Sequence, residues 1–411
     1  MSENPNAGQA NWFHRNPKKT LVFFTLALIL VIAYAAEKYL EFTHHRQGLV
    51  LSAEAENRYI RLREYRPGTR LLLSFPRHHL PYTDNVFPKK YRLDIDKNGF
   101  IVPSQKYDHP DKVIVFLGGS TTECMYMDAD HRFPYLVGKI LEEETGQRIN
   151  SYNGGMSGLN SLHAIDLLIN KVIPLHPRVV VFMENINDLS TLLYEGTYWN
   201  RHMVRSPLET LKKKQMVGKL LKEMLFPELN EAYRNLRETL TGKPKDEFAG
   251  ARGKKLTVDK AKLVHEFAMN LQTLVCICQA HEITPVLMTQ ENRITPHPDP
   301  VIAAYLGRYG TETGLSYACL KELYDAFNDT IREVGQKNHV MVIDLAREIP
   351  PDKKYLYDIV HFNDAGSELA AQIIAARLKG LIPPQQRHSA LLMNGCIKVP
   401  SFFNPFSPNG G

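Results

Sequence analysis

The sequence is poor in cysteine and has none in the spacing of a metal site. Its five cysteines are Cys124, Cys276, Cys278, Cys319 and Cys396. No C-x-x-C pair occurs, and such scattered positions fit neither a zinc site nor a disulfide framework. Cys276 and Cys278 lie two positions apart on a predicted helix, so their side chains diverge. We interpret the cysteines as small buried apolar side chains.

Motifs of nucleic-acid-binding proteins are also absent, although the formal net charge is +6. The positive charge is local, because Arg201 to Lys255 contains 14 Lys or Arg against 7 Asp or Glu. We therefore expect no nucleic-acid partner. The hydrophobic content of 44% excludes a disordered or fibrous chain and is typical of a protein with a folded core.

A long apolar run, Thr20–Ala36, lies near the amino terminus and contains 17 residues without a charge. A helix that spans a bilayer needs roughly 17–25 such residues, and a signal-peptide core has roughly 7–15. The run therefore predicts a retained transmembrane signal anchor. Cleavage near Ala33-Tyr34-Ala35, which resembles a small-residue cleavage site, is the alternative.

Basic residues flank the apolar run unevenly and predict its orientation. Arg15, Lys18 and Lys19 precede it, whereas Lys38 and Arg46 follow it closely. Because Lys and Arg favour the cytoplasmic side, we expect a single-pass membrane protein whose large domain is extracytoplasmic.

The remaining chain divides by composition. We predict a cytoplasmic tail (1–19), an anchor (20–36), a charged and helix-compatible stalk (37–67), a lead-in β segment (68–111), an α/β domain (112–380) with a basic helical insert (about 198–257), and an irregular C-terminal tail (381–411). In the lead-in segment, the short apolar pieces LLLSF, YRLDI and GFIV indicate the strands of a hairpin.

Strands and helices alternate in the α/β domain. Short apolar runs rich in β-branched residues predict strands at Lys112–Leu117, Val179–Met183, Ile283–Met288 and Val340–Ile343, with a further strand region ending at Asn153. Helical patterns lie at Phe133–Glu144, Leu162–Ile169, Lys260–Ala280, Tyr317–Val334 and Ala365–Leu378. This alternation predicts a doubly wound parallel sheet, in which ligands bind beyond the carboxyl ends of the strands.

A serine follows the first of these strands, in the sequence Gly118-Gly119-Ser120-Thr121-Thr122-Glu123. The two glycines permit a sharp turn with positive φ, which would expose Ser120 at the edge of the sheet as a nucleophile. The alternative is that Ser120 or Thr121 only caps the following helix, with Glu123 completing a capping box.

Donors for an oxyanion follow the next two strands. Gly158 lies in the glycine-rich turn after Asn153, and Asn187 follows the strand that ends at Met183. A backbone N–H in a turn and an Asn amide are suitable groups to stabilise the negative charge that develops in acyl transfer. Either residue also fits a structural interpretation, Gly158 as an ordinary tight turn and Asn187 or Asp188 as a helix cap.

Asp358 and His361 lie on a predicted loop near the C-terminus. An Asp three residues before a His can hold one imidazole nitrogen while the other faces a nucleophile. A surface His beside a helix capped by Asn363 or Asp364 is the alternative. The order of all four motifs, each at a strand end or on a loop, favours the catalytic interpretation.

This ordered set resembles the SGNH (GDSL-type) serine hydrolases, whose four blocks supply Ser, Gly, Asn and His. The resemblance spans roughly Val113 to Leu378 and implies a flavodoxin-like three-layer α/β/α fold with a Ser-His-Asp triad. Ser120, Gly158 and Asn187 match the first three blocks, and Asp358 with His361 matches the last. The form FLGGSTTE looks like that of membrane-anchored branches of the family.

Two positions depart from the family pattern. Gly119 stands where many members have Asp, and Asn185 stands where the third block usually has Gly. Because Asn adopts positive φ more readily than most residues, we expect the turn at Asn185 to survive.

The resemblance implies acyl-serine chemistry that needs no metal and no organic cofactor. Ser120, His361 and Asp358 would form the triad, and the oxyanion hole would comprise the N–H groups of Ser120 and Gly158 with the Asn187 amide. We expect a serine esterase that removes acetyl or other short acyl groups from an extracytoplasmic glycan or lipid. An O-acyltransferase acting on a polysaccharide through the same site and a catalytically silent membrane-tethered binding protein are the alternatives.

The basic insert contains Lys212, Lys213 and Lys214, followed by a helical pattern around Met216 to Leu240. It is interpreted either as a surface that contacts anionic lipid head groups or glycans, or as a solvated helical lid.

Overall fold

The computed structural model of the chain describes residues 12–46, 56–87, 89–202, 204–212, 256 and 258–382. Contacts divide the chain into one unit of residues 1–59 and 210–244 and a second of residues 60–209 and 245–411. The predicted helix at Met216 to Leu240, Lys213, Lys214 and the tail beyond Ile382 lie outside the described residues.

The first unit contains the apolar run, which forms a helix longer than the run itself. Helix α1 covers Trp12–Arg15 and α2 covers Pro17–Arg46. Within α2, the 23 residues Pro17–Tyr39 have a mean hydropathy of 2.2 and are long and apolar enough to cross a membrane. This length and composition fit both an anchor and a signal sequence.

The end of the predicted stalk is a strand. Residues Glu56–Ile60 form β1, which pairs with β7 at Leu208–Lys212 in a two-stranded sheet. The expectation of a helix-compatible stalk is therefore wrong for these residues. Lys212, the first lysine of the basic triplet, is the last residue of β7.

The second unit is built on a five-stranded parallel sheet with the order β5-β4-β6-β8-β9. Its strands are β4 at Lys112–Gly118, β5 at Ile149–Asn153, β6 at Val179–Met183, β8 at Thr284–Met288 and β9 at Met341–Ile343. In chain order this is the 2-1-3-4-5 arrangement of flavodoxin-like folds. The predicted doubly wound fold is confirmed.

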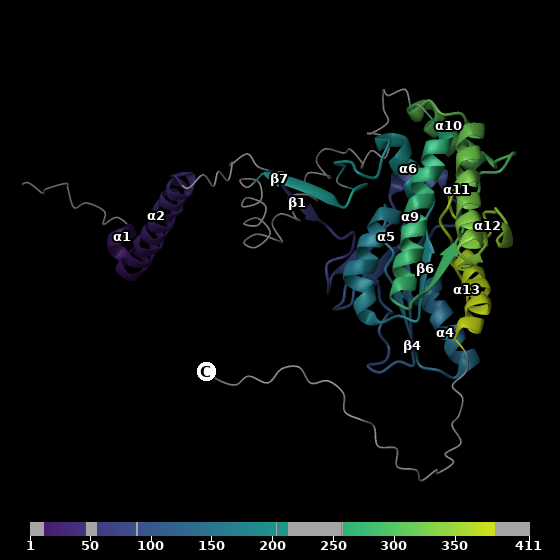
Figure 1. The fold of residues 1–411 in the computed structure, drawn as a ribbon, viewed down its shortest axis with the longest axis horizontal. Helices are drawn as coiled ribbons and strands as arrows, with labels where there is room; N and C mark the ends of the chain where they lie inside the picture. The colour runs from purple at the N-terminus through teal and green to yellow at the C-terminus, as the bar shows by residue number, and fades with distance from the viewer. Residues whose placement is uncertain are drawn as a thin grey trace, which may run out of the picture. The chain divides into compact units, whose positions relative to one another are not determined.

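Helices cover both faces of this sheet. Alternate strand residues point to opposite sides, so each face presents apolar side chains that helices bury. Val115 and Leu117 pack with α5, α6, α9, α10 and α11, whereas Ile114 and Phe116 pack with α4, α12 and α13 (Figure 1). The helices are α3 at Ser120–Glu123, α4 at Phe133–Thr145, α5 at Ser161–Leu167, α6 at Ile186–Glu195, α9 at Lys260–Ala280, α10 at Pro300–Thr313, α11 at Tyr317–Lys337, α12 at Leu345–Glu348 and α13 at Asp364–Leu378.

The lead-in segment attaches to the edge of the main sheet. Strands β2 at Arg70–Ser74 and β3 at Lys90–Asp94 pair antiparallel, as two of the three apolar pieces predict. The third piece forms no strand, because Ile101 makes only isolated bridges to Ile95 and Asn153. The bridge to Asn153 joins the segment to β5.

Candidate active site

Three of the predicted site residues come from neighbouring strands. Ser120 follows β4, Gly158 follows β5 and Asn187 follows β6, and β4 lies between the other two strands. Connections that leave β4 in opposite directions open a crevice at the carboxyl edge of such a sheet. The order of strands therefore brings residues far apart in sequence to one place.

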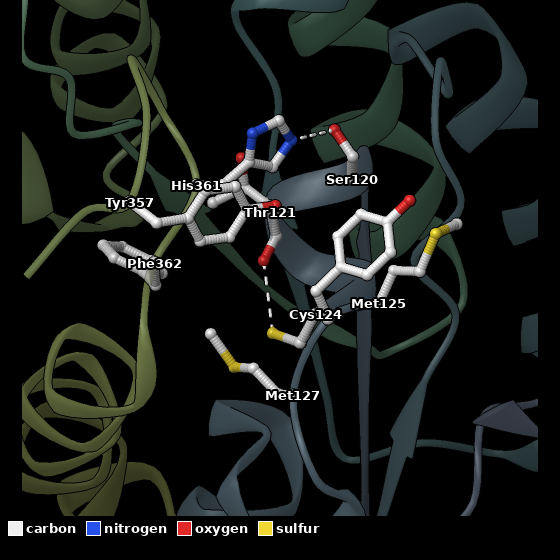
Figure 2. Close-up of a pocket in the computed structure, with 9 residues that line it drawn as sticks. Ser120, Thr121, Cys124, Met125, Met127, Tyr357, His361 and Phe362 are labelled. Carbon is white, nitrogen blue, oxygen red and sulfur yellow. Dashed lines mark hydrogen bonds between the residues drawn. The ribbon is translucent and has the colours of Figure 1, made fainter. Parts of the chain in front are cut away.

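A loop between β9 and α13 brings His361 and Asp358 to the same edge. His361 Nε2 lies 2.7 Å from Ser120 Oγ, and His361 Nδ1 lies 2.7 Å from Asp358 Oδ2. In Figure 2 the His361 ring points toward Ser120. The three side chains form a continuous hydrogen-bonded relay, with the ring nitrogens in the geometry that general-base activation of a serine requires.

The carboxylate of Asp358 also fixes the loop that carries His361. Its Oδ1 accepts hydrogen bonds from the backbone N–H of Val360 at 3.0 Å and of His361 at 2.9 Å. Burial favours the neutral acid, but the charge of His361 and these hydrogen bonds outweigh it and lower the pKa of Asp358. Asp358 is therefore a carboxylate at neutral pH and orients the imidazole.

The ring of Tyr357 stacks on the imidazole of His361, with centroids 5.4 Å apart and planes at 8°. The backbone N–H of Tyr357 also donates to the carbonyl of His361 at 2.9 Å. These contacts hold the ring in place, and only 24% of the His361 side chain is exposed.

The glycines before Ser120 are needed for space rather than for positive φ. Gly119 has φ −78°, and Gly118 also lies outside the left-handed region, so the expected positive φ is wrong at both. A Cβ on Gly118 would lie 2.7 Å from the carbonyl oxygen of Met183, and one on Gly119 would lie 2.1 Å from Asn187 Nδ2. Because Met183 of β6 and Asn187 of α6 lie so close to this turn, no side chain larger than that of glycine fits at Gly118 or Gly119.

The helix-capping alternative for Ser120 is wrong. The N-cap of α3 is Gly119, with no side-chain cap, and Ser120 is the first helical residue. Glu123 makes no capping box either, because its buried carboxylate accepts hydrogen bonds from Tyr65 and Ser157. Asn363 does cap α13, because its side chain accepts a hydrogen bond from the N–H of Gly366 at 3.0 Å. The alternative interpretation of His361 expected this cap.

The candidate oxyanion donors lie in the segments that follow β4, β5 and β6. Gly158 has φ +77°, a conformation that favours glycine, and Asn187 Nδ2 donates to the carbonyl of Leu159 at 2.8 Å, which leaves its second amide hydrogen available. Within the described part of the chain, the backbone N–H groups of Ser120 and Gly158 have no hydrogen-bond acceptor. Three donors are thus available near the nucleophile.

Asn185 does not adopt the expected positive φ. Its φ is −167°, which is extended backbone, and its amide donates to the Tyr324 carbonyl at 3.2 Å and to Asn328 Oδ1 at 2.9 Å. These hydrogen bonds to α11 hold the turn in a conformation that does not require glycine. Asp188 is not a helix cap, since it is buried and accepts hydrogen bonds from Ser161 and Tyr198.

Gln290 joins three parts of the site, a role that the sequence prediction missed. Its Nε2 donates to Thr121 Oγ1 at 2.7 Å, and its Oε1 accepts from the N–H of Ile186 at 3.1 Å. Thr121 Oγ1 lies 3.3 Å from the carbonyl of Val360, on the loop of His361. The sequence feature that could have revealed this role is the polar run Thr289–Asn292, which directly follows β8 at the same sheet edge.

A pocket of about 10 Å³ lies beside Ser120 and His361 (Figure 2). It is lined by Ser120, Thr121, Cys124, Met125, Tyr126, Met127, Tyr357, His361 and Phe362. A volume of this size holds about one water molecule, or a group as small as a methyl. Arg132 fixes one wall by donating to the carbonyls of Cys124 and Met127, each at 3.3 Å.

Other reactive groups near the pocket are poorly suited to compete with Ser120. Burial raises the pKa of the Cys124 thiol to about 12, so it stays protonated and a weak nucleophile. Among the described residues, no group of three His, Cys, Asp or Glu side chains is placed to hold a metal ion.

Comparison with known sequences identifies the family. Residues 116–369, more than half of the chain, match the sequence model of the GDSL-like lipase/acylhydrolase family. The chain belongs to this family. It is therefore an ester-hydrolysing enzyme. No curated protein matches the chain.

Solved structures of the same fold have little sequence in common with this chain. A lipase/acylhydrolase from Enterococcus faecalis is 18% identical, with 66% of this chain and 96% of that chain covered and a TM-score of 0.39. An acetylxylan esterase from Geobacillus stearothermophilus is 15% identical, with 66% and 94% covered and a TM-score of 0.37. A GDSL-like lipase from Bacteroides thetaiotaomicron is 13% identical, with 66% and 88% covered and a TM-score of 0.35.

Proposed function

We propose that this enzyme removes short acyl groups, above all acetyl, from an acylated glycan or lipid through an acyl-enzyme at Ser120. The relay of Ser120, His361 and Asp358, with two contacts of 2.7 Å, carries the proposal. Its geometry is that of a serine activated by a general base whose tautomer a carboxylate fixes.

In the first half of the reaction, His361 Nε2 takes the proton of Ser120 Oγ while the oxygen attacks the ester carbonyl. The N–H groups of Ser120 and Gly158 and the Asn187 amide stabilise the negative charge on the former carbonyl oxygen. The carboxylate of Asp358 stabilises the imidazolium that forms. His361 then gives its proton to the leaving alcohol, and the acyl group stays on Ser120.

In the second half, water attacks the acyl-serine carbonyl while His361 Nε2 takes the water proton. The tetrahedral intermediate forms in the same oxyanion hole. Its collapse releases the carboxylic acid, and the proton on His361 returns to Ser120 Oγ, which restores the resting site.

The size of the pocket beside Ser120 supports a short acyl group. A pocket of about 10 Å³ accepts a methyl but not the chain of a fatty acid. We expect turnover of p-nitrophenyl esters to fall steeply from acetate through butyrate to octanoate. Met127→Ala, which removes a buried side chain from the pocket wall, should extend turnover to butyrate, whereas Met269→Ala, an exposed control, should not. Equal turnover of acetate and octanoate by the wild-type protein would contradict the proposal.

For the location of the enzyme, we propose a single-pass anchor with the esterase unit outside the cytoplasm. Helix α2 is long enough, and Arg15, Lys18 and Lys19 outnumber the basic residues that follow the apolar run closely. A C-terminal fusion to a phosphatase that is active only outside the cytoplasm tests the orientation. Phosphatase activity is expected, and an inactive fusion beside an active cytoplasmic reporter would overturn it.

A further inference from the structure

The oxyanion loop, defined here as residues 153–159, is held by side chains from outside the family-matched residues 116–369. Its first half is fixed from within the sheet, since Gly154 and Met156 donate their N–H groups to the carbonyls of Phe116 and Gly118 at 2.8 and 3.1 Å. The second half, Ser157 and Gly158, is held by Arg63 and Tyr65 from residues 61–67, the last part of the predicted stalk, which we call the stalk end.

Arg63 binds the carbonyl oxygen of Ser157 with two donors. Its Nε lies 3.1 Å from that oxygen, and Nη2 donates to the same atom. Nη2 also lies 3.1 Å from the position that a Cβ on Gly158 would take. The guanidinium therefore lies directly against the peptide unit that joins Ser157 to Gly158.

This peptide unit carries one of the candidate oxyanion donors. Because a trans peptide is planar, the C=O of Ser157 and the N–H of Gly158 point in opposite directions. A guanidinium that fixes the direction of the carbonyl also fixes the direction of the N–H. A charged donor on the carbonyl further polarises the peptide, which makes the N–H of Gly158 a stronger donor.

The side chain of Ser157 is held by a second chain of contacts. Ser157 Oγ donates to one carboxylate oxygen of Glu123, and the hydroxyl of Tyr65 donates to the other. Glu123 is fully buried and lies three residues after Ser120. Within the stalk end, Arg63 thus holds the carbonyl of Ser157, and Tyr65 holds its side chain through Glu123.

The charges in this group offset one another. Burial, together with the nearby charge of Arg61, lowers the pKa of Arg63, while Glu123 raises it. Burial raises the pKa of Glu123, while its hydrogen bonds from Ser157 and Tyr65 and the charge of His361 oppose that rise. The stalk end thus supplies a cation beside the oxyanion loop, and helix α3 supplies the carboxyl group that links Tyr65 to Ser157.

We propose that Arg63 is a positioning residue that orients and polarises the Ser157–Gly158 peptide for oxyanion stabilisation, with Tyr65 and Glu123 fixing Ser157. The proposal rests on the proposed function, because it assigns a role within that reaction. It makes the stalk end part of the catalytic apparatus, although these residues lie outside the family-matched residues 116–369.

The test uses the full-length protein in detergent and p-nitrophenyl acetate, and compares Arg63→Ala with Arg66→Ala, an exposed arginine of the same segment. For Arg63→Ala we expect a kcat about 10²-fold lower, similar to the loss of one oxyanion donor, and a KM close to that of the wild type. Free guanidinium ion at low concentration should restore part of the kcat of Arg63→Ala and leave Arg66→Ala unchanged.

Equal kcat in Arg63→Ala and Arg66→Ala would overturn the role of Arg63, as would a loss that appears in KM alone. A loss of kcat that guanidinium does not restore, accompanied by a lower melting temperature, would also overturn it, because that pattern indicates a purely structural role.

If Arg63→Ala does not fold, Arg63→Lys and Tyr65→Phe carry the test. Lysine can replace one of the two hydrogen bonds of Arg63, and phenylalanine removes the hydroxyl that binds Glu123. Both variants should therefore lower kcat by a smaller factor than that expected for Arg63→Ala. Wild-type kcat in both variants would contradict the proposal. Failure of the proposed function looks different, because the wild-type protein itself would then show no turnover.

Discussion

The two sides of the candidate site are constructed differently. On the relay side, Asp358 and His361 lie three residues apart on one loop and bond to each other and to Ser120. On the oxyanion side, the donors come from three strands and the loop of Gly158 is held by Arg63. Only one contact of the relay, that of His361 with Ser120, therefore joins distant residues, whereas every part of the oxyanion hole depends on contacts between distant segments.

Removal of the nucleophile should have the largest effect. Ser120→Ala leaves no hydroxyl for acyl transfer, and we expect kcat for p-nitrophenyl acetate to fall about 10⁶-fold. Labelling by a fluorophosphonate probe should be lost as well. Ser74→Ala, an exposed serine of β2, is the control and should label fully. Labelling of Ser120→Ala at the wild-type level would exclude Ser120 as the nucleophile.

The carboxylate of the relay should come next. Asp358→Asn keeps the shape of the side chain but favours the wrong imidazole tautomer, so we expect kcat to fall about 10⁴-fold. The loss should be in kcat and not in KM, measured with the same ester. A decrease of less than tenfold would show that Asp358 does not orient His361.

On the oxyanion side, Asn187→Ala should cost less than either relay change. One donor to the developing oxyanion is typically worth about 10²–10³ in kcat, and the relay remains intact in this variant. Steady-state kinetics should show a low but measurable kcat, and fluorophosphonate should still label Ser120. A decrease as large as that of Ser120→Ala would mean that Asn187 does more than donate one hydrogen bond.

Gly119→Ala tests the space that the amide of Asn187 occupies. The new Cβ would lie 2.1 Å from Asn187 Nδ2, and the amide end of the side chain is the part that can move. We expect a loss of about 10-fold to 10²-fold in kcat with little change in melting temperature. In the double variant with Asn187→Ala the two losses should not multiply, because both remove the same donor. Fully multiplicative losses would contradict this explanation.

The smallest effect concerns stability and a carboxyl group outside the relay. In contrast to Asp358, burial raises the pKa of Glu291 to about 9, well above its ordinary 4.5. The folded state therefore holds this proton, and the stability associated with it is present below about pH 4.5 and lost as the pH rises toward 9. Glu291→Gln stays neutral, so its melting temperature should exceed that of the wild type by several degrees at pH 8.5 and match it near pH 4.5. Glu282→Gln, an exposed control, should show no such trend.

Sequence patterns predict the strands and the Asp358–His361 pair well, because the apolar runs and the spacing that mark them are local. Strand β6 was predicted at its observed bounds, Val179–Met183, from its β-branched run. The spacing of Asp358 and His361 on a single loop predicted their contact. Helix α10 at Pro300–Thr313 was missed, since it was not recognised among the apolar and Pro-containing residues after β8.

The oxyanion side was harder to predict because its features are set by contacts between distant residues. Asn185 takes extended backbone rather than positive φ because Asn328 on α11 binds its amide. Gly119 is small because Asn187 fills the space beside it. Arg63 lies 94 residues from Ser157, in residues that the sequence indicated only as a charged, helix-compatible stalk, so no local signal marks its role.

The central claim is that acyl transfer proceeds through Ser120, and trapping the intermediate tests it most directly. The full-length protein is mixed with p-nitrophenyl acetate, quenched in acid during turnover and mapped by peptide mass spectrometry. We predict one added acetyl group on Ser120 in the wild-type protein and none in Ser120→Ala. An acetyl group on another residue, or one that persists in Ser120→Ala, would contradict the account.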